Sequence, residues 1–155
     1  TLRFFNGQYT KALVGVSDTY TDEPAVLAEP LGDCNDPDSK VYTFKKMIGN
    51  QPADVVNKRI LVPHLFGTTG GPNPFWGTWD WDLALLDAVD ETGVPYTSGD
   101  YGFVSTEMYL SVNHEVAPKE QAYGFNGCED CHSGNQIDWS ELGYTGDPVN
   151  GGTCP

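Results

Sequence analysis

The stretch Cys128-Glu129-Asp130-Cys131-His132 is the most informative part of this chain of 155 residues. Two thiols at this spacing can add to the two vinyl groups of one porphyrin, and the next residue presents its imidazole to the iron. A zinc half-site would need a second Cys or His pair nearby, and a thioredoxin-like motif would need a strand followed by a helix that begins at the first thiol. Neither context is evident. The spacing therefore predicts covalent haem c on Cys128 and Cys131, with His132 as an iron ligand.

The iron of such a haem needs a sixth ligand unless it is an open catalytic site. The candidates are His64, His114, Met47 and Met108, with a lysine as a more remote alternative. We favour His114 as the second metal ligand, because the short segment between it and the attachment motif can fold its imidazole over the other face of the haem. His64, flanked by proline and apolar residues, is the alternative. Two histidine ligands predict a low reduction potential and leave no open position, so no catalytic residue is assigned.

The other two cysteines, Cys34 and Cys154, stand alone and far apart in the sequence. If haem consumes the first pair, the remaining pair is free to form one disulfide. Two buried thiols or an intermolecular bridge are the alternatives. Haem attachment of this type takes place outside the cytoplasm, where thiols oxidise, so we expect an intramolecular disulfide and a periplasmic or extracellular protein.

The excess of acidic residues indicates which kinds of molecule this protein can bind. The chain has 22 acidic and 8 basic residues and a formal net charge of -14. This charge repels nucleic acid and anionic membrane surfaces and favours a basic partner, although it is equally consistent with a role in solubility. No apolar run approaches the roughly 18 to 20 residues that span a bilayer, and the first residues lack a signal-peptide pattern. We expect a soluble, processed chain with no membrane span and no nucleic-acid function.

The 18 glycines and 11 prolines break the chain too often for long helices over most of its length. Aromatic and β-branched residues around Asn6-Gly7 predict a hairpin or paired short strands. The apolar spacing over residues 80–89 predicts a helix, with Thr78 or Asp80 as its cap. Residues 99–112 suit either a helix or a strand. We expect one domain over residues 1–155, in a loop-rich α+β class with few helices and a small sheet organised around the covalent haem.

Aromatic residues near the attachment motif are expected to pack against the porphyrin, although ordinary core positions would look the same. They are Tyr123, Phe125, Trp139 and Tyr144.

Several further stretches form a pattern that is more specific than the attachment motif alone. The most informative is His114-Glu115-Val116-Ala117-Pro118-Lys119-Glu120-Gln121-Ala122, which stands shortly before the motif. The others are residues 45–52, 63–67, 75–76, 99–109, 138–139, 142–144 and 147–148. Over roughly residues 40–148 the chain resembles the C-terminal part of octahaem tetrathionate reductase-type multihaem c-type cytochromes.

The resemblance implies close haem packing for electron hopping and, in the family, reduction of small sulfur or nitrogen oxyanions at one haem with a distal lysine. This chain has one attachment motif, so the resemblance implies a separate subunit, a fragment or a relative reduced to one haem. One haem needs at most two imidazoles and the sequence has three histidines. A spare His64 or His114 would then be unligated or would reach the iron of a neighbouring chain.

Together these observations favour an electron-transfer domain or subunit with a low-potential bis-histidine haem, working beside other haems. Its partners would be a redox protein, other haem-bearing chains or copies of itself. Two alternatives are part of an enzyme that reduces tetrathionate, nitrite or hydroxylamine, and a structural subunit in which the haem only braces the fold. The sequence favours the carrier over a catalytic subunit acting by itself.

Overall fold

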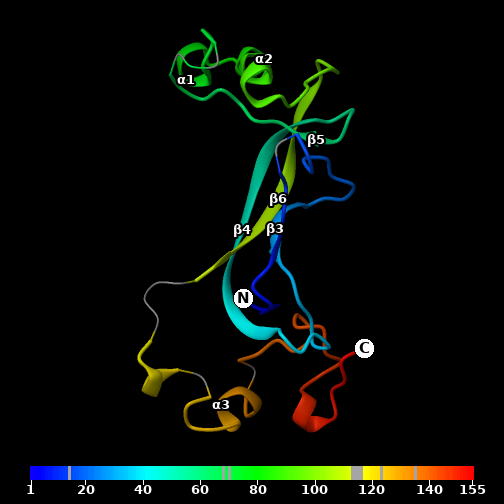
Figure 1. Ribbon diagram of the computed structural model, residues 1–155, viewed down its shortest axis with the longest axis vertical. Helices are drawn as coiled ribbons and strands as arrows, with labels where there is room; N and C mark the ends of the chain where they lie inside the picture. The colour runs from blue at the N-terminus through cyan, green and yellow to red at the C-terminus, as the bar shows by residue number, and fades with distance from the viewer. Residues whose placement is uncertain (14, 68, 70, 113–116, 123, 135) are drawn as a thin grey trace. The chain divides into compact units, whose positions relative to one another are not determined.

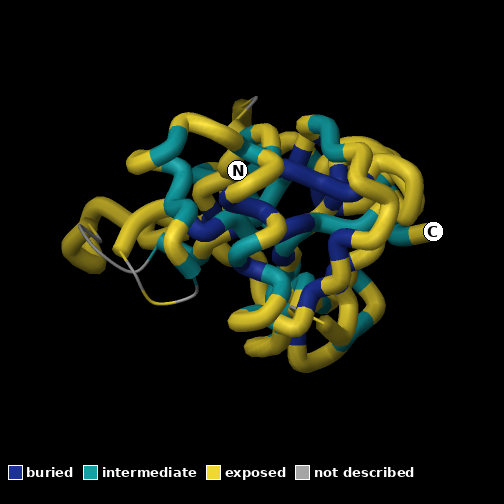
Figure 2. The backbone as a smooth tube through the Cα atoms, turned by 90° about the horizontal axis from the view of Figure 1, so that it is seen from above, coloured by how far each residue is buried: buried dark blue, intermediate teal, exposed yellow. Residues whose placement is uncertain are grey.

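A computed structural model of the chain describes residues 1–155 except 14, 68, 70, 113–116, 123 and 135. Most of the described chain is loop, and Figure 2 shows short buried segments separated by longer exposed ones. The regular elements, labelled where space allows in Figure 1, are β1 (Leu2–Phe5), β2 (Tyr9–Lys11), β3 (Ala25–Pro30), β4 (Lys40–Asp54), β5 (Arg59–Ile60), α1 (Phe75–Thr78), α2 (Trp81–Thr92), β6 (Tyr101–Ser111), η1 (Lys119–Gln121), α3 (Glu129–His132) and η2 (Pro148–Asn150).

The prediction of a loop-rich α+β fold with few helices and a small sheet is confirmed. The strands form a mixed sheet in the order β1-β4-β6-β3-β2, with β5 paired to β4. The stretch 99–112, which suited a helix or a strand, contains strand β6 (Tyr101–Ser111). Among the described residues, no helix combines the length and the apolar character needed to cross a membrane.

By internal contacts the chain divides into two compact units. The first contains residues 1–10, 29–46 and 109–155, and the second contains residues 11–28 and 47–108. Strands β3, β4 and β6 each contribute residues to both units. The single domain over residues 1–155 therefore stays a prediction, and each unit is described by itself.

In the first unit, β1 pairs antiparallel with the beginning of β4. Leu2 lies opposite Thr43 and Phe5 opposite Lys40. The expected pairing of β1 with β2 is wrong, because β4 is the neighbour of β1 and β3 is the neighbour of β2. The physical reason lies in the aromatic side chains of β4. The Phe5 ring lies 5.5 Å from that of Phe44 and 6.1 Å from that of Tyr42, so pairing with β4 brings both rings to it. Tyr9 of β2 joins the same cluster, 5.0 Å from Phe5, without strand pairing.

A disulfide closes the first unit, as predicted. Cys34 is bonded to Cys154, and the Cα atoms of the two residues lie 5.9 Å apart. The bond joins positions that are 120 residues apart in the sequence. Beside it, Asn35 Nδ2 donates to the Pro155 carbonyl at 3.3 Å. The acidic turn before β4 is held by its own hydrogen bonds, because Asp33 Oδ1 accepts from the backbone N–H groups of Asn35 and Asp36. The disulfide thus ties the C-terminal segment to this turn.

In the second unit, the predicted helix is confirmed as α2. Asp80 caps it by accepting from the Leu83 N–H at 3.1 Å, and Gly93 ends it in the left-handed conformation with φ of 70°. Figure 1 shows α1 beside α2. The core of this unit consists of Leu61, Leu85, Val94 and Tyr96.

A buried carboxylate ends β4. Asp54 is fully buried and accepts hydrogen bonds from Asn57 N at 2.9 Å, Asn57 Nδ2 at 2.7 Å and Ser98 N at 3.3 Å. Desolvation raises the pKa of this carboxyl, but the hydrogen bonds together outweigh it and lower the pKa to about 2. Asp54 therefore stabilises the turn between β4 and β5 in its charged form.

Breaking the disulfide should destabilise the protein without touching the attachment motif. In the chain-entropy model, closure of a loop of this length contributes roughly 4 to 5 kcal/mol, so we expect Cys34→Ser to lower the free energy of unfolding by up to about that amount. Urea denaturation followed by tryptophan fluorescence measures the change. Cys34→Ser/Cys154→Ser should match the single variant, and an unchanged urea midpoint in both would contradict the prediction.

Removing the charge of Asp54 should destabilise the fold in a pH-dependent way. We expect Asp54→Asn to lower the free energy of unfolding by about 1 to 3 kcal/mol at neutral pH, because buried donors lose a charged acceptor. A carboxyl whose folded pKa is lowered stabilises above its unfolded pKa of about 4 and loses this effect as pH falls toward 2. The difference in free energy of unfolding between wild type and Asp54→Asn, measured by urea denaturation, should therefore become smaller as pH falls from about 4 toward 2. The exposed Asp90→Asn serves as control, and a pH-independent difference would contradict the prediction.

Candidate functional site

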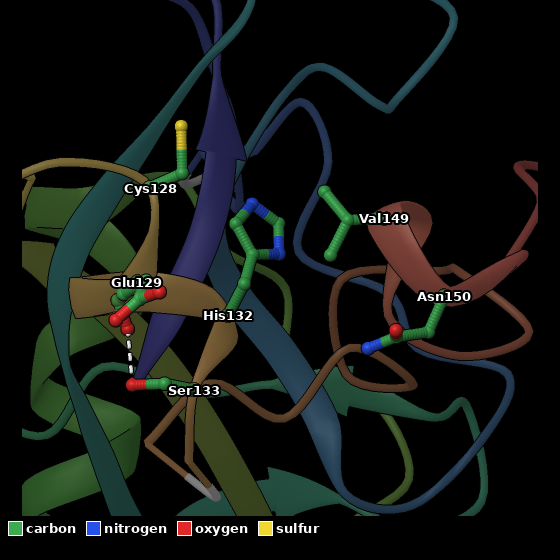
Figure 3. Close-up of a pocket in the computed structure, with 6 residues that line it drawn as sticks. All are labelled: Cys128, Glu129, His132, Ser133, Val149 and Asn150. Atoms are coloured by element: carbon green, nitrogen blue, oxygen red, sulfur yellow. Dashed lines mark hydrogen bonds between the residues drawn. The ribbon is translucent and has the colours of Figure 1, made fainter.

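The attachment motif forms a single helical turn. Cys128 precedes α3, and the N–H groups of Cys131 and His132 donate to its carbonyl at 3.2 and 3.0 Å. Residues three and four apart lie on one face of a helix, so the turn places these three side chains together. Figure 3 shows Cys128 and His132 pointing to the same side of α3, away from Glu129 and Ser133. The backbone thus arranges two thiols and one imidazole as a haem would require.

The loop before the turn is folded onto α3 by Asp130. Its Oδ2 accepts from Gly124 N at 3.1 Å and from Asn126 N at 3.0 Å. Gly127, with φ of 121°, takes a conformation that residues with a Cβ rarely adopt. Asp130, one of the two residues between the thiols, therefore has a local role in shaping the approach to Cys128.

The alternatives to haem attachment find little support in the structure. Cys128 is exposed, Cys131 is partly buried, and neither is in a disulfide. Within the described ranges, no group of three or more His, Cys, Asp or Glu side chains is arranged to hold a metal ion, as a zinc site would require. The described residues from 117 to 127 include η1 and no strand, so the strand-then-helix context of a thioredoxin-like motif is missing there.

The ring of His132 is held on one edge and one face. Its Nδ1 lies 2.6 Å from Asp147 Oδ1, and because a carboxylate only accepts, Nδ1 carries the proton and donates. The indole of Trp139 stacks on the ring, with centroids 5.0 Å apart and an interplanar angle of 8°. In the described part of the chain, Nε2 has no hydrogen-bond partner. The unprotonated nitrogen available to a metal is therefore Nε2.

Two hollows border His132, both within the first unit. The smaller, of about 420 Å³, lies between α3 and η2 and is lined by Cys128, Glu129, His132, Ser133, Val149 and Asn150 (Figure 3). The larger is a groove of about 960 Å³. It is lined by Cys131 and His132, by Trp139 and its neighbours, and by residues of β1 and β4.

The groove fits a flat apolar group. Its walls include Val41 and Tyr42 of β4, which are 43% and 37% exposed, together with Leu2, Val112 and Ile137. In the groove, apolar side chains gather beside the Cys131 thiol and the His132 imidazole, and the Cys128 thiol lines the smaller hollow, which also borders His132. Together these residues offer what a porphyrin needs, namely attachment points, an iron ligand and an apolar surface. The residues present therefore fit a haem.

Of the two histidines considered as the sixth ligand, the structure describes only His64. His114 lies outside the described residues. His64 belongs to the second unit and is buried, with Nδ1 3.4 Å from Asp87 Oδ2 and Nε2 3.1 Å from the Phe66 carbonyl. Both partners only accept hydrogen bonds, so His64 would have to give up a contact to bind iron. Its role as a ligand stays a prediction.

Of the aromatic residues expected around the porphyrin, Trp139 lines the groove. The Tyr144 ring packs edge-on against the Trp139 ring, with the ring centroids 5.9 Å apart. Phe125 is exposed and Tyr123 is outside the described residues. Sequence reasoning missed the contact between Asp147 and His132. Asp147 precedes Pro148, a pattern typical of a helix cap, but nothing in that pattern points to a partner 15 residues earlier.

Comparisons with known proteins agree with this geometry. The family model described as "Cytochrome c bacterial" matches residues 1–135. An octahaem cytochrome c from Shewanella oneidensis has a similar structure, with a TM-score of 0.77 and 36% sequence identity over 97% of this chain and 34% of its own. The chain thus spans about a third of that protein's length. The similarity includes the first 40 residues, which the sequence pattern had left out. No curated protein matches the chain significantly.

Proposed function

Since this chain belongs to the bacterial cytochrome c family, we propose that it is an electron-transfer domain with a low-potential bis-histidine haem that works beside other haems. It is a c-type cytochrome, and its cofactor is haem c. The observation that carries the proposal is the α3 turn, whose helical spacing brings the two thiols and the His132 ring to one face. An imidazole already held by Asp147 and Trp139 needs little rearrangement to bind iron, which suits a rigid electron carrier.

Cys128 and Cys131 would hold the haem. Each thiol would add its S–H across one vinyl group, with a C–S and a C–H bond in place of the S–H bond and the vinyl double bond, so no oxidant would be needed. When bound, the haem takes up and releases one electron at its iron. The chain's own residues then bind and orient the group. His132 supplies Nε2, and the apolar wall of β1 and β4 excludes water from one side.

His114 is our candidate for the sixth ligand, and His64 is the second candidate. His114 stands only 14 positions before Cys128 in the sequence, so the intervening segment is short enough to return the imidazole to the haem. A second imidazole in place of a methionine thioether gives a lower potential. It also leaves the iron without an open position, which favours electron transfer over reduction of an oxyanion at this haem.

Other haems are expected close by but outside this sequence. The chain contains one attachment motif, whereas the similar Shewanella protein is an octahaem cytochrome and is about three times as long. Neighbouring haems would come from further polypeptide, from another haem-bearing chain or from a second copy. Thioether formation and the Cys34–Cys154 disulfide both favour a periplasmic or extracellular location.

Covalent attachment is tested by mass. We expect the denatured wild-type protein to exceed its polypeptide mass by one haem, and Cys128→Ala/Cys131→Ala to retain none. Either single variant should keep the haem through one thioether and show a red-shifted pyridine haemochrome band, because one vinyl group stays unsaturated. Cys34→Ser is the matched control and should keep the full mass. A wild-type mass equal to the amino acids alone would refute the proposed function.

Axial ligation is tested by absorption and EPR spectroscopy. We expect wild-type haem to be low-spin and insensitive to nitrite or hydroxylamine, and His114→Ala to become high-spin with a raised midpoint potential. His64→Ala is the matched control and should leave the spectrum unchanged. If only His64→Ala changes the spectrum, His64 is the ligand instead. If neither does, Met47 or Met108 takes that place, and a nitrite-induced shift in wild type would favour the reductase alternative.

A further inference from the structure

Resting on the proposed function, we infer that Asp147 is a positioning residue that fixes the protonation and orientation of His132 and lowers the reduction potential of the haem. Asp147 Oδ1 lies 2.6 Å from His132 Nδ1, a short distance typical of a charge-assisted hydrogen bond. The two side chains are largely buried, with relative exposures of 15% and 23%. A contact of this kind selects one of two possible tautomers, the one that leaves Nε2 for iron.

Asp147 is itself held in place. Its Oδ1 accepts from Val149 N and its Oδ2 from Asn150 Nδ2, both at 3.1 Å, so the carboxylate caps η2 while it binds His132. Its carbonyl accepts from Gly152 N at 2.9 Å. A Cβ at Gly152 would collide with the backbone of Gly146, so this close return of the chain requires glycine. The carboxylate is thus placed by backbone structure and has little freedom to follow the ring.

The segment that carries Asp147 is anchored at both ends. Tyr144 packs against Trp139, the ring that stacks on His132, and also lies 6.1 Å from Phe4 of β1. Thr145 N donates to the Thr153 carbonyl at 2.9 Å, directly before the disulfide at Cys154. The hydrogen-bonding edge and the stacked face of the imidazole are therefore fixed by one closed segment of the first unit.

The electronic consequence follows from charge. A carboxylate that accepts the Nδ1 proton pushes electron density onto the imidazole and makes Nε2 a stronger donor. A stronger donor stabilises ferric iron more than ferrous iron, and the potential falls. A neutral acceptor in the same place would orient the ring but donate less. Asp147 should therefore affect the potential more than the attachment of the haem.

The test is the midpoint potential of holo-protein variants. Asp147→Asn keeps the shape and removes the charge, and we expect it to retain covalent haem. Partners of metal-binding histidines typically contribute 10- to 100-fold in metal affinity. We expect Asp147→Asn to weaken the affinity of His132 for ferric iron about tenfold more than its affinity for ferrous iron. For a one-electron couple, this difference raises the midpoint potential by about 59 mV. Asp147→Glu should restore most of the wild-type potential.

Two comparisons separate this role from simple alternatives. Glu120→Gln removes one exposed charge of the first unit and should shift the potential far less. Asn150→Ala removes a donor from the carboxylate, leaves its bond to His132, and should shift the potential in the opposite direction to Asp147→Asn. A potential for Asp147→Asn equal to that of Glu120→Gln, with haem bound, would overturn the inference.

One measurement needs no variant. In ferric wild-type protein, NMR should detect an exchangeable proton on the axial imidazole that is protected from solvent, because Asp147 accepts it. Rapid exchange of that proton would overturn the inference even if Asp147→Asn did not fold. Absence of covalent haem mass from the wild type would instead refute the proposed function, so the two failures are distinguishable.

Discussion

The geometry of one helical turn is the constraint on which the functional part of this protein depends. Hydrogen bonds to the Cys128 carbonyl close the turn and place Cys128, Cys131 and His132 on one face. A cofactor attached at two points and ligated at a third has almost no freedom to rotate. With the proposed attachment at Cys128 and Cys131 and ligation by His132, the surrounding fold would need only to cover the haem and to hold the His132 ring.

The first unit supplies that support from segments far apart in the sequence. Strands β1 and β4 form a wall of the groove, Trp139 stacks on the His132 ring, and Asp147 accepts a hydrogen bond from Nδ1 of that ring. The Cys34–Cys154 disulfide ties the end of this assembly to the turn before β4. A chain with so many loops has few layers of secondary structure to hold such residues, so covalent closure replaces part of that packing.

Membership of the bacterial cytochrome c family and similarity to an octahaem protein give the single attachment motif its significance. The chain matches a third of that octahaem protein along almost the whole of its own length, and it contains one attachment motif. Its net charge of -14 adds a long-range field that favours approach by basic partners. These features suit the electron-transfer role of a c-type cytochrome.

The sequence alone determined whatever depends on local spacing. The attachment motif and the helix that begins at Asp80 or just before it follow from short-range rules, and the pairing of the two remaining cysteines follows from counting. Residues 99–112 were ambiguous because their apolar spacing fits either period. Only the tertiary structure decided that β1 pairs with β4 and that Asp147 meets His132, because both contacts join segments whose approach depends on the path of the chain between them.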